Sequence, residues 1–203
     1  MSQTRPALVV VAGPNGSGKT SLTTQVLQHH WLQGCVYINP DVIARDRFGD
    51  WNAPHAVLQA AQYAEGERER CLAGRVGLAF ESVLSAPDKL DFIQRAKGAG
   101  YFIRFFFVGT ASPAINASRV AQRVMEGGHD VPITKIISRY DKSLANFGTV
   151  AAWADRAYLY DNSIDGEPAQ LLLRTVEGRV ARQYVQPLPA WAQAVTAAWP
   201  RPA

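Results

Sequence analysis

The sequence predicts an α/β fold in which a mostly parallel sheet of five to six strands lies between helices on both faces. Short apolar runs alternate with longer segments of helical periodicity over most of the chain, and this alternation favours parallel strands joined by helices. The run 101–108 is apolar almost throughout, as a strand covered on both faces should be. A glycine-rich loop between the first apolar run and the first helical segment is typical of the same class.

Capping and helix-terminating residues indicate where the expected helices begin and end. Gly98 and Gly100 stop one helix, and Gly127 with Gly128 stops another, because glycine is favoured just past a helix C-terminus. Asn39 and Pro40 have the residue types of an N-cap and a first helical residue, which predicts a short helix there. The expected strands cover 7–12, 36–38, 77–83, 101–108 and 156–160, and the other expected helices cover 21–30, 53–76, 87–97, 113–126 and 132–146.

The C-terminal part has a different pattern. Two short strands, 171–176 and 179–185, flank Glu177 and Gly178, which predicts a hairpin that either extends the sheet edge or lies beside it. A last short helix is expected over 187–199. We therefore expect one domain over residues 1–203, with a core at about 7–163 and the hairpin and helix at 168–203.

Composition limits the class of protein. The chain has 203 residues, 47% of them hydrophobic and 19% charged, so it is globular rather than disordered. Its net charge of +4 is spread over several expected helices, a distribution that suits phosphate contacts in one cleft better than a nucleic-acid stripe. The two cysteines form no C-x-x-C pair, which argues against a zinc site. With no signal sequence or membrane-spanning run, we expect a cytoplasmic protein.

A phosphate-binding loop is the most informative motif. Residues 13–20 match G-x-x-x-x-G-K-[ST] and lie between an apolar strand and a helix. Backbone amides and the positive helix N-terminus then face an anion, while Lys19 reaches the β- and γ-phosphates and the Thr20 hydroxyl is placed to bind Mg²⁺. The expected nucleotide-binding residues are Gly13, Pro14, Asn15, Gly16, Ser17, Gly18, Lys19, Thr20 and Ser21.

Polar residues follow other expected strands, where ligands bind in parallel sheets. Asp41 falls in the first turn of the short helix, where the helix dipole keeps a carboxylate ionised and available as a base. Glu81 ends an apolar strand and is either paired with an arginine or turned towards substrate or Mg²⁺-bound water. Ser82 is a further hydroxyl contact or a turn residue. Asn162, after the last core strand, is a candidate for contact with the adenine or belongs to an Asx turn.

A lid is expected over about 112–135. Arg119 and Arg123 are four residues apart and share one helix face, where they either clamp the transferring phosphate or form a solvated basic surface. Arg139 is a third candidate. His129 either contacts phosphate or caps a helix. Closure of such a segment would exclude water from phosphoryl transfer.

Taken together, these motifs resemble the zeta toxin family of phosphate-loop kinases, in particular its shorter stand-alone members. The resemblance covers about residues 8–163. It rests on motifs that recur in one order: Gly13 to Thr20, Asn39-Pro40-Asp41, Phe80 to Ser85, Ala96 to Tyr101, Arg119-Val120 with Arg123-Val124, Gly127 to Pro132, Arg139-Tyr140 and Tyr160 to Ser163.

The resemblance implies a nucleotide-kinase-like three-layer α/β/α sandwich. It also implies ATP- or GTP-dependent, Mg²⁺-dependent phosphorylation of a UDP-amino sugar, typically the C3 hydroxyl of UDP-N-acetylglucosamine, and a possible separate protein antitoxin. By the same resemblance, Asp41 matches the base, Lys19 the phosphate ligand and Thr20 the Mg²⁺ ligand. Glu81 matches an acid that contacts the sugar nucleotide, and Arg119 and Arg123 match arginines that neutralise the transferring phosphate.

Two other functions fit a phosphate loop. A guanine-nucleotide switch should carry N-K-x-D, and the chain contains no Asn-Lys pair, while Asp46 to Gly49 fits D-x-x-G without an apolar strand before it. A nucleoside, nucleotide or nucleic-acid-end kinase on the same scaffold is the stronger alternative. A nucleic-acid kinase should interleave aromatic residues with a basic groove, and the sequence reveals no such cluster, so nucleic acid is an unexpected partner.

Overall fold

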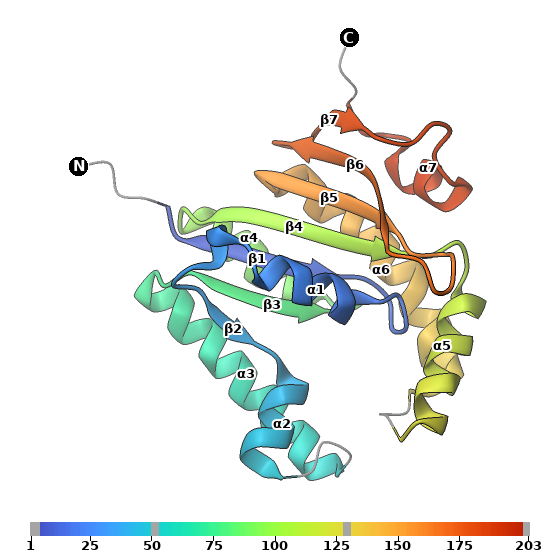
Figure 1. Cartoon of the computed structure of the whole chain (residues 1–203). Helices are drawn as coiled ribbons and strands as arrows, with labels where there is room; N and C mark the ends of the chain where they lie inside the picture. Colours follow the sequence, from blue (N-terminus) through green and yellow to red (C-terminus); the bar gives the residue numbers. More distant parts are fainter. Residues whose placement is uncertain (1–4, 50–52, 128–130, 201–203) are drawn as a thin grey trace.

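The fold is a single seven-stranded sheet with helices on both faces (Figure 1). The computed structural model describes residues 5–49, 53–127 and 131–200. The strand order is β2-β3-β1-β4-β5-β6-β7; the first five of these strands run parallel, and β6 and β7 are antiparallel to their neighbours. The strands are β1 (Ala7–Ala12), β2 (Val36–Ile38), β3 (Leu78–Ser82), β4 (Phe102–Gly109), β5 (Arg156–Asp161), β6 (Gln170–Val176) and β7 (Arg179–Gln183).

Helices divide between the two faces. Buried residues of α3, α4, α6 and α7 pack on one face of the sheet, whereas α1 and the short 3-10 helix η1 pack on the other. Helix α2 packs along α3, and α5 packs along α6. The bounds are α1 (Lys19–Leu27), η1 (His30–Leu32), α2 (Pro40–Phe48), α3 (Pro54–Gly74), α4 (Pro87–Gly98), α5 (Pro113–Met125), α6 (Ile133–Trp153) and α7 (Ala190–Thr196).

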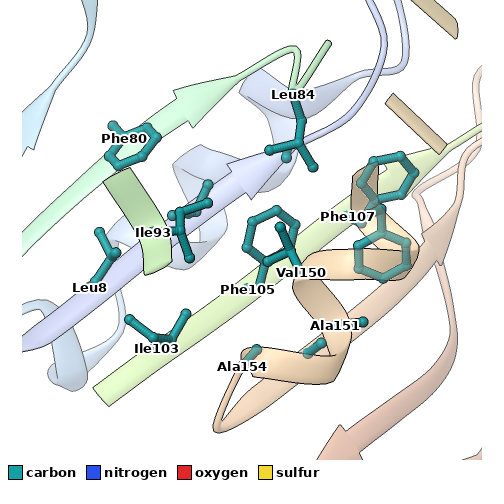
Figure 2. Packing of buried hydrophobic residues seen from close by; sticks show 14 of the residues in the cluster. Leu8, Phe80, Leu84, Ile93, Ile103, Phe105, Phe107, Val150, Ala151 and Ala154 are labelled. Atoms are coloured by element: carbon teal, nitrogen blue, oxygen red, sulfur yellow. The ribbon is translucent and has the colours of Figure 1, made fainter. Parts of the chain in front are cut away.

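The larger core lies between the central strands and α4 and α6. Phe105 and Phe107 point from β4 towards α6, where both rings stack on Phe147, and Figure 2 shows Val150 and Ala151 packed beside them. Leu8 and Phe80 extend this apolar surface across β1 and β3, and Ile93 of α4 covers it. Alternation along each strand places these residues on one face, so the central strands are held rigidly where their carboxyl ends form the site.

The strand register brings three chain segments level at that edge. Ala12 pairs with Ser82 on one side and with Phe107 on the other, and the Gly13 amide donates to the Ser82 carbonyl at 3.2 Å. The loops that follow β1, β3 and β4 therefore leave the sheet side by side.

The predicted α/β/α sandwich is confirmed, and the open question about the hairpin is answered. β6 and β7 extend the sheet beyond β5, which raises the strand number to seven. α6 runs seven residues past the expected end at Asn146, because Phe147, Val150 and Ala151 are buried against β4 and outweigh the weak helix preference of Gly148. No helix in the described ranges is long and apolar enough to cross a membrane.

Candidate active site

The phosphate loop is shaped by glycines that neighbouring segments approach closely. Gly16 and Gly18 have φ angles of 75° and 91°, a region that favours glycine. A Cβ at Gly16 would lie 2.5 Å from the Asn116 carbonyl oxygen, and one at Gly18 would lie 2.2 Å from the Asn162 side-chain nitrogen. Because these two residues have no side chain, α5 and the loop after β5 can approach the phosphate loop closely, and so can a phosphate.

Two asparagine side chains hold the loop from its outer side. The Asn116 amide donates to the Asn15 carbonyl at 2.7 Å, and the Asn162 amide donates to the Ser17 carbonyl at 2.9 Å. Asn162 was predicted to lie near the nucleotide, whereas Asn116 was not singled out. Asn116 is fully buried in α5, which the sequence does not reveal; its low helix propensity alone does not mark it as a functional residue.

The loop leaves a helix N-terminus open to an anion. Helix α1 begins at Lys19 with Gly18 as its N-cap and no side-chain hydrogen bond to its first amides. Unpaired amides and the helix dipole both favour a phosphate there. The buried Ser17 hydroxyl also has no hydrogen-bond partner among the described residues, which suits a loop that awaits a ligand.

Lys19 folds back over this loop. Its ammonium donates to the carbonyls of Gly13 and Pro14, at 2.9 Å each. Burial lowers the pKa of Lys19 to about 8, against the opposing effect of the Glu81 carboxylate. The negative charge of a bound phosphate would stabilise the protonated, cationic form of this lysine.

Opposite the phosphate loop, the site is bounded by the N-terminus of α2, which we call its acceptor side. The Asn39 side chain accepts the Asp41 amide at 2.9 Å, and Pro40 is the first helical residue, as predicted. This cap fixes Asp41 in the first turn, where its carboxylate is solvent-exposed and lies at the cavity described below.

Glu81 joins the two sides through hydrogen bonds. One of its oxygens accepts the Thr20 hydroxyl at 3.4 Å, and the other accepts the Tyr37 hydroxyl at 3.1 Å. Tyr37 in turn accepts the Asn39 amide at 2.9 Å. Burial, followed by the nearby Glu81 carboxylate, raises the pKa of Tyr37, which keeps the phenol protonated as a donor. Tyr37 was read only as part of an apolar strand, so its role was missed.

These groups open on one cavity of about 280 Å³. A larger hollow of about 560 Å³ between the hairpin and α7 is lined by glutamines and apolar residues without a charged group, whereas the smaller cavity carries the cations that phosphate chemistry needs. Its lining residues are Asn15, Gly16, Lys19, Thr20, Asn39, Pro40, Asp41, Glu81, Ser82, Val83, Arg123, Val131 and Arg139.

The three candidate arginines separate into two groups. Arg123 and Arg139 line the cavity, and Arg139 also donates to the Asn15 side chain at 3.4 Å. Arg119 lies outside the lining set: it donates to the carbonyls of Asn162 and Ile164, at 2.7 and 3.2 Å, and pairs with a carboxylate of the same loop. Ser82 lines the cavity, and its hydroxyl accepts the Leu84 amide, as expected of a turn residue; its contact with substrate stays a prediction. His129 lies outside the described residues.

The oxygen donors here suit Mg²⁺. Mg²⁺ is usually held by one or two protein oxygens, several waters and substrate phosphates, and the Thr20 hydroxyl and the Glu81 carboxylate are adjacent at the mouth of the loop. The described residues contain no cluster of three or more acidic, histidine or cysteine side chains for a metal held by protein alone. The set fits a nucleotide-bound Mg²⁺.

The C-terminal helix supports the nucleotide side of the loop. The Trp191 indole donates to the Asp161 carboxylate at 2.9 Å, and its ring lies so close to Gly109 that a Cβ there would meet it at 2.3 Å. Asp161 also accepts the Ser163 hydroxyl at 2.5 Å. The turn that carries Asn162 is thereby fixed from α7.

Comparison with known proteins gives a family match over most of the chain. The family model described as Zeta toxin matches residues 1–164. An uncharacterised protein of Haemophilus influenzae is 27% identical over 132 residues, which cover 65% of this chain and 91% of that protein.

Solved structures share the fold at low sequence identity. The AvrRxo1-ORF1:-ORF2 complex contains a chain with a TM-score of 0.68 and 20% identity; the match covers 94% of this chain but only 64% of that one. The same pair solved with ATP gives a TM-score of 0.62 at 20% identity, covering 88% and 61%. The PezAT chromosomal toxin-antitoxin system of Streptococcus pneumoniae gives 0.59 at 13% identity, covering 96% and 80%.

Proposed function

The chain belongs to the Zeta toxin family, and on that premise we propose that it is a kinase that transfers the γ-phosphoryl group of ATP or GTP to a hydroxyl of a UDP-amino sugar such as UDP-N-acetylglucosamine. The observation that carries the proposal is the shared cavity, in which a phosphate loop faces Asp41 across a gap also lined by Glu81 and Arg123. A nucleotide-binding module would have no need of a base there.

The residues divide the chemistry between them. Asp41 accepts the proton of the acceptor hydroxyl while the oxygen of that hydroxyl bonds to the γ-phosphorus. The bond between the γ-phosphorus and the oxygen that bridges to the β-phosphate breaks at the same time. Lys19 and the loop amides hold the β- and γ-phosphates, and Arg123 with Arg139 neutralises the transferring group. Mg²⁺, when bound beside Thr20 and Glu81, offsets phosphate charge. Glu81 and Ser82 contact the acceptor, and His129 is a further candidate for this role.

Arg119 has a different proposed role from Arg123. Its bonds to the carbonyls of Asn162 and Ile164 in the loop after β5 support a role on the nucleoside side, with Asn162. The structure solved with ATP, in a protein of similar fold, supports ATP as the donor. The PezAT toxin-antitoxin system among the similar folds supports a separate antitoxin as a partner of this chain.

A substrate screen read by mass tests the proposal. The protein is incubated with Mg²⁺, ATP or GTP, and separate panels of UDP-sugars, nucleosides, nucleotides and oligonucleotides with a 5′-hydroxyl. We expect a UDP-amino sugar to gain one phosphoryl group, and the product to disappear with Asp41→Asn and Lys19→Ala. Asp46→Asn, which removes an exposed carboxylate from the same helix, is the matched control and should keep activity. Turnover confined to nucleosides, nucleotides or oligonucleotides would replace the acceptor with that of the alternative kinase.

A further inference from the structure

The sheet face that carries α1 is rich in arginine and tyrosine over strands β5 to β7. Of the described helices, only α1 and η1 contribute buried residues to this face, and they pack over β1, β3 and the adjoining side of β4. Figure 1 shows α1 on the near side of β1, while β5, β6 and β7 continue the sheet beyond it. The side chains on β5 to β7 therefore form a surface of their own.

The register shows which side chains share this surface. Arg104 pairs with Arg156, and Arg156 pairs with Val176, which pairs with Arg179. In the next row Phe106 pairs with Tyr158, Tyr158 with Arg174 and Arg174 with Arg182. Paired residues lie on the same face of a sheet. We call this surface the arginine–tyrosine face: Arg104, Arg156, Tyr158, Tyr160, Arg174, Arg179, Arg182 and Tyr184.

Its aromatic rings are partly open to solvent and flanked by guanidinium groups. Tyr184 is 42% exposed, and Tyr158 and Tyr160 are half-buried. Arg182 lies over the Tyr184 ring at 4.9 Å, and Tyr158 stacks on Phe106 at 4.7 Å between centroids. Rows of this kind hold flat rings in place, as a stacking platform for bases requires.

Four arginines of the face, Arg156, Arg174, Arg179 and Arg182, form no ion pair within the described residues. Arginines elsewhere form ion pairs, among them Arg5, Arg70 and Arg95. The carboxylate of Asp161 in β5 is bound by Trp191 of α7, which packs on the opposite face of the sheet. An anionic partner would complement the charge of these four arginines.

We propose that the arginine–tyrosine face binds single-stranded nucleic acid, with phosphates on the arginines and bases stacked on the tyrosines. The face ends near the nucleotide side of the cleft, because Tyr160 lies two residues before Asn162. The sequence conceals this surface: its residues come from strands β4 to β7 and from Tyr184 directly after β7, and only strand pairing brings them together. The proposal is independent of the proposed kinase reaction.

Fluorescence anisotropy without ATP or Mg²⁺ tests the proposal. The probes are fluorescein-labelled oligouridine and oligothymidine of about 12 nucleotides, a length within the usual site size of single-strand binders. We expect binding that weakens with salt, as counterion release requires. Arg179→Gln/Arg182→Gln should reduce the slope of log K against log salt by about 1.4, and Tyr184→Leu should raise Kd by about 5-fold or more. The ratio of RNA to DNA affinity identifies which of the two is the natural ligand.

Controls separate this face from general basicity and from the cleft. Arg70→Gln/Arg95→Gln removes the same charge from exposed positions on α3 and α4 and should leave Kd unchanged. Absence of binding at low salt, equal weakening by this control, or loss only with Lys19→Ala would each overturn the proposal. The proposal would also be overturned if no oligonucleotide binds and the chain instead self-associates in a way that Tyr184→Leu abolishes.

Discussion

The Tyr37 hydroxyl donates to Glu81 at 3.1 Å, and through this bond the acceptor side of the cavity is tied to the phosphate loop. Asn39 connects to Tyr37 on one side and caps the helix of Asp41 on the other, while Glu81 accepts the Thr20 hydroxyl. The proposed base and the proposed Mg²⁺ ligand are thus held by one chain of hydrogen bonds. A small displacement in such a chain is costly to phosphoryl transfer, because the reaction depends on alignment.

Tyr37→Phe tests this positioning role. The substitution keeps the ring and removes only the hydroxyl, so Glu81 and Asn39 each lose a partner. A hydrogen bond to a charged group contributes about 1.5–3 kcal/mol, and we expect kcat to fall by about 10-fold with little change in the KM for ATP. Tyr184→Phe, which removes an exposed phenol outside the cavity, should leave kcat unchanged. Equal kinetics for Tyr37→Phe and the wild type would show that the hydrogen-bond chain is structural only.

The arginines should differ in which kinetic constant they control. Arg123→Ala and Arg139→Ala should each lower kcat by roughly 10²-fold or more, because both line the cavity and such groups stabilise charge in the transition state. Arg119→Ala should chiefly raise the KM for ATP, because Arg119 holds the loop of Asn162. Steady-state kinetics with varied ATP measures both constants, and Arg70→Ala on α3 is the control. A kcat effect of Arg119→Ala as large as that of Arg123→Ala would return Arg119 to the transferring phosphate.

The sequence was sufficient wherever the geometry of the candidate site depends on a local motif. The phosphate loop, the capped Asp41 and the strand-end Glu81 were all predicted, because each lies within a few residues of its own start or stop signal. The sheet then brought Asp41 and Glu81 to the loop by the general rule for parallel strands. What was missed depends on contacts between distant segments. Asn116 meets Asn15 across 101 positions, and no local pattern signals such a pair.

The basic aromatic surface shows the same limit. A linear search for aromatic residues among arginines finds no cluster, because strand pairing sets Arg104 beside Arg156 and Arg174 beside Arg182. The end of α6 was misjudged for a related reason. Gly148 weakens the local helix signal, and only the stacking of Phe147 on β4 shows why the helix continues.

Trp191 should matter for nucleotide binding although it lies beyond the part of the chain that matches the family. Trp191→Phe retains most of the ring and removes the donor to Asp161. We expect the KM for ATP to rise by about 5-fold, because the bond to Asp161 acts on the nucleotide only through the turn of Asn162 and so transmits part of the roughly 1.5–3 kcal/mol that a hydrogen bond to a charged group contributes, while the KM for the acceptor stays unchanged. Trp199→Phe alters a tryptophan of the same tail that packs on Phe147 and serves as the control. An unchanged KM for ATP in Trp191→Phe would separate the tail from the nucleotide site.

Asp155 should make the stability of the whole domain depend on pH. Its carboxylate is 4% exposed, pairs with Arg5 and Lys97 at 2.9 Å each, and accepts the Ile103 amide at 2.8 Å. Burial alone would raise the pKa of Asp155, but the bonds from Arg5, Ile103 and Lys97 outweigh it and hold the pKa below its ordinary value. The native state therefore binds this proton more weakly than the unfolded chain does. The stabilisation is complete above the unfolded pKa of about 3.9 and is lost as pH falls through the lower native pKa.

Asp155→Asn should accordingly destabilise the protein by about 1.5–3 kcal/mol at pH 7, because it weakens the charge-assisted hydrogen bonds that the buried carboxylate accepts, while Arg5 and Lys97 stay partly solvated. Urea unfolding of wild type and variant, measured from pH 7 down to about 3, gives the difference in the free energy of unfolding. That difference should be constant down to about pH 4 and shrink below it, because the Asp155 carboxylate of the unfolded wild-type chain takes up a proton before that of the native protein does. Asp141→Asn, at an exposed position on α6, should show little difference at any pH. A difference for Asp155→Asn that grows as the pH falls would contradict the depressed pKa.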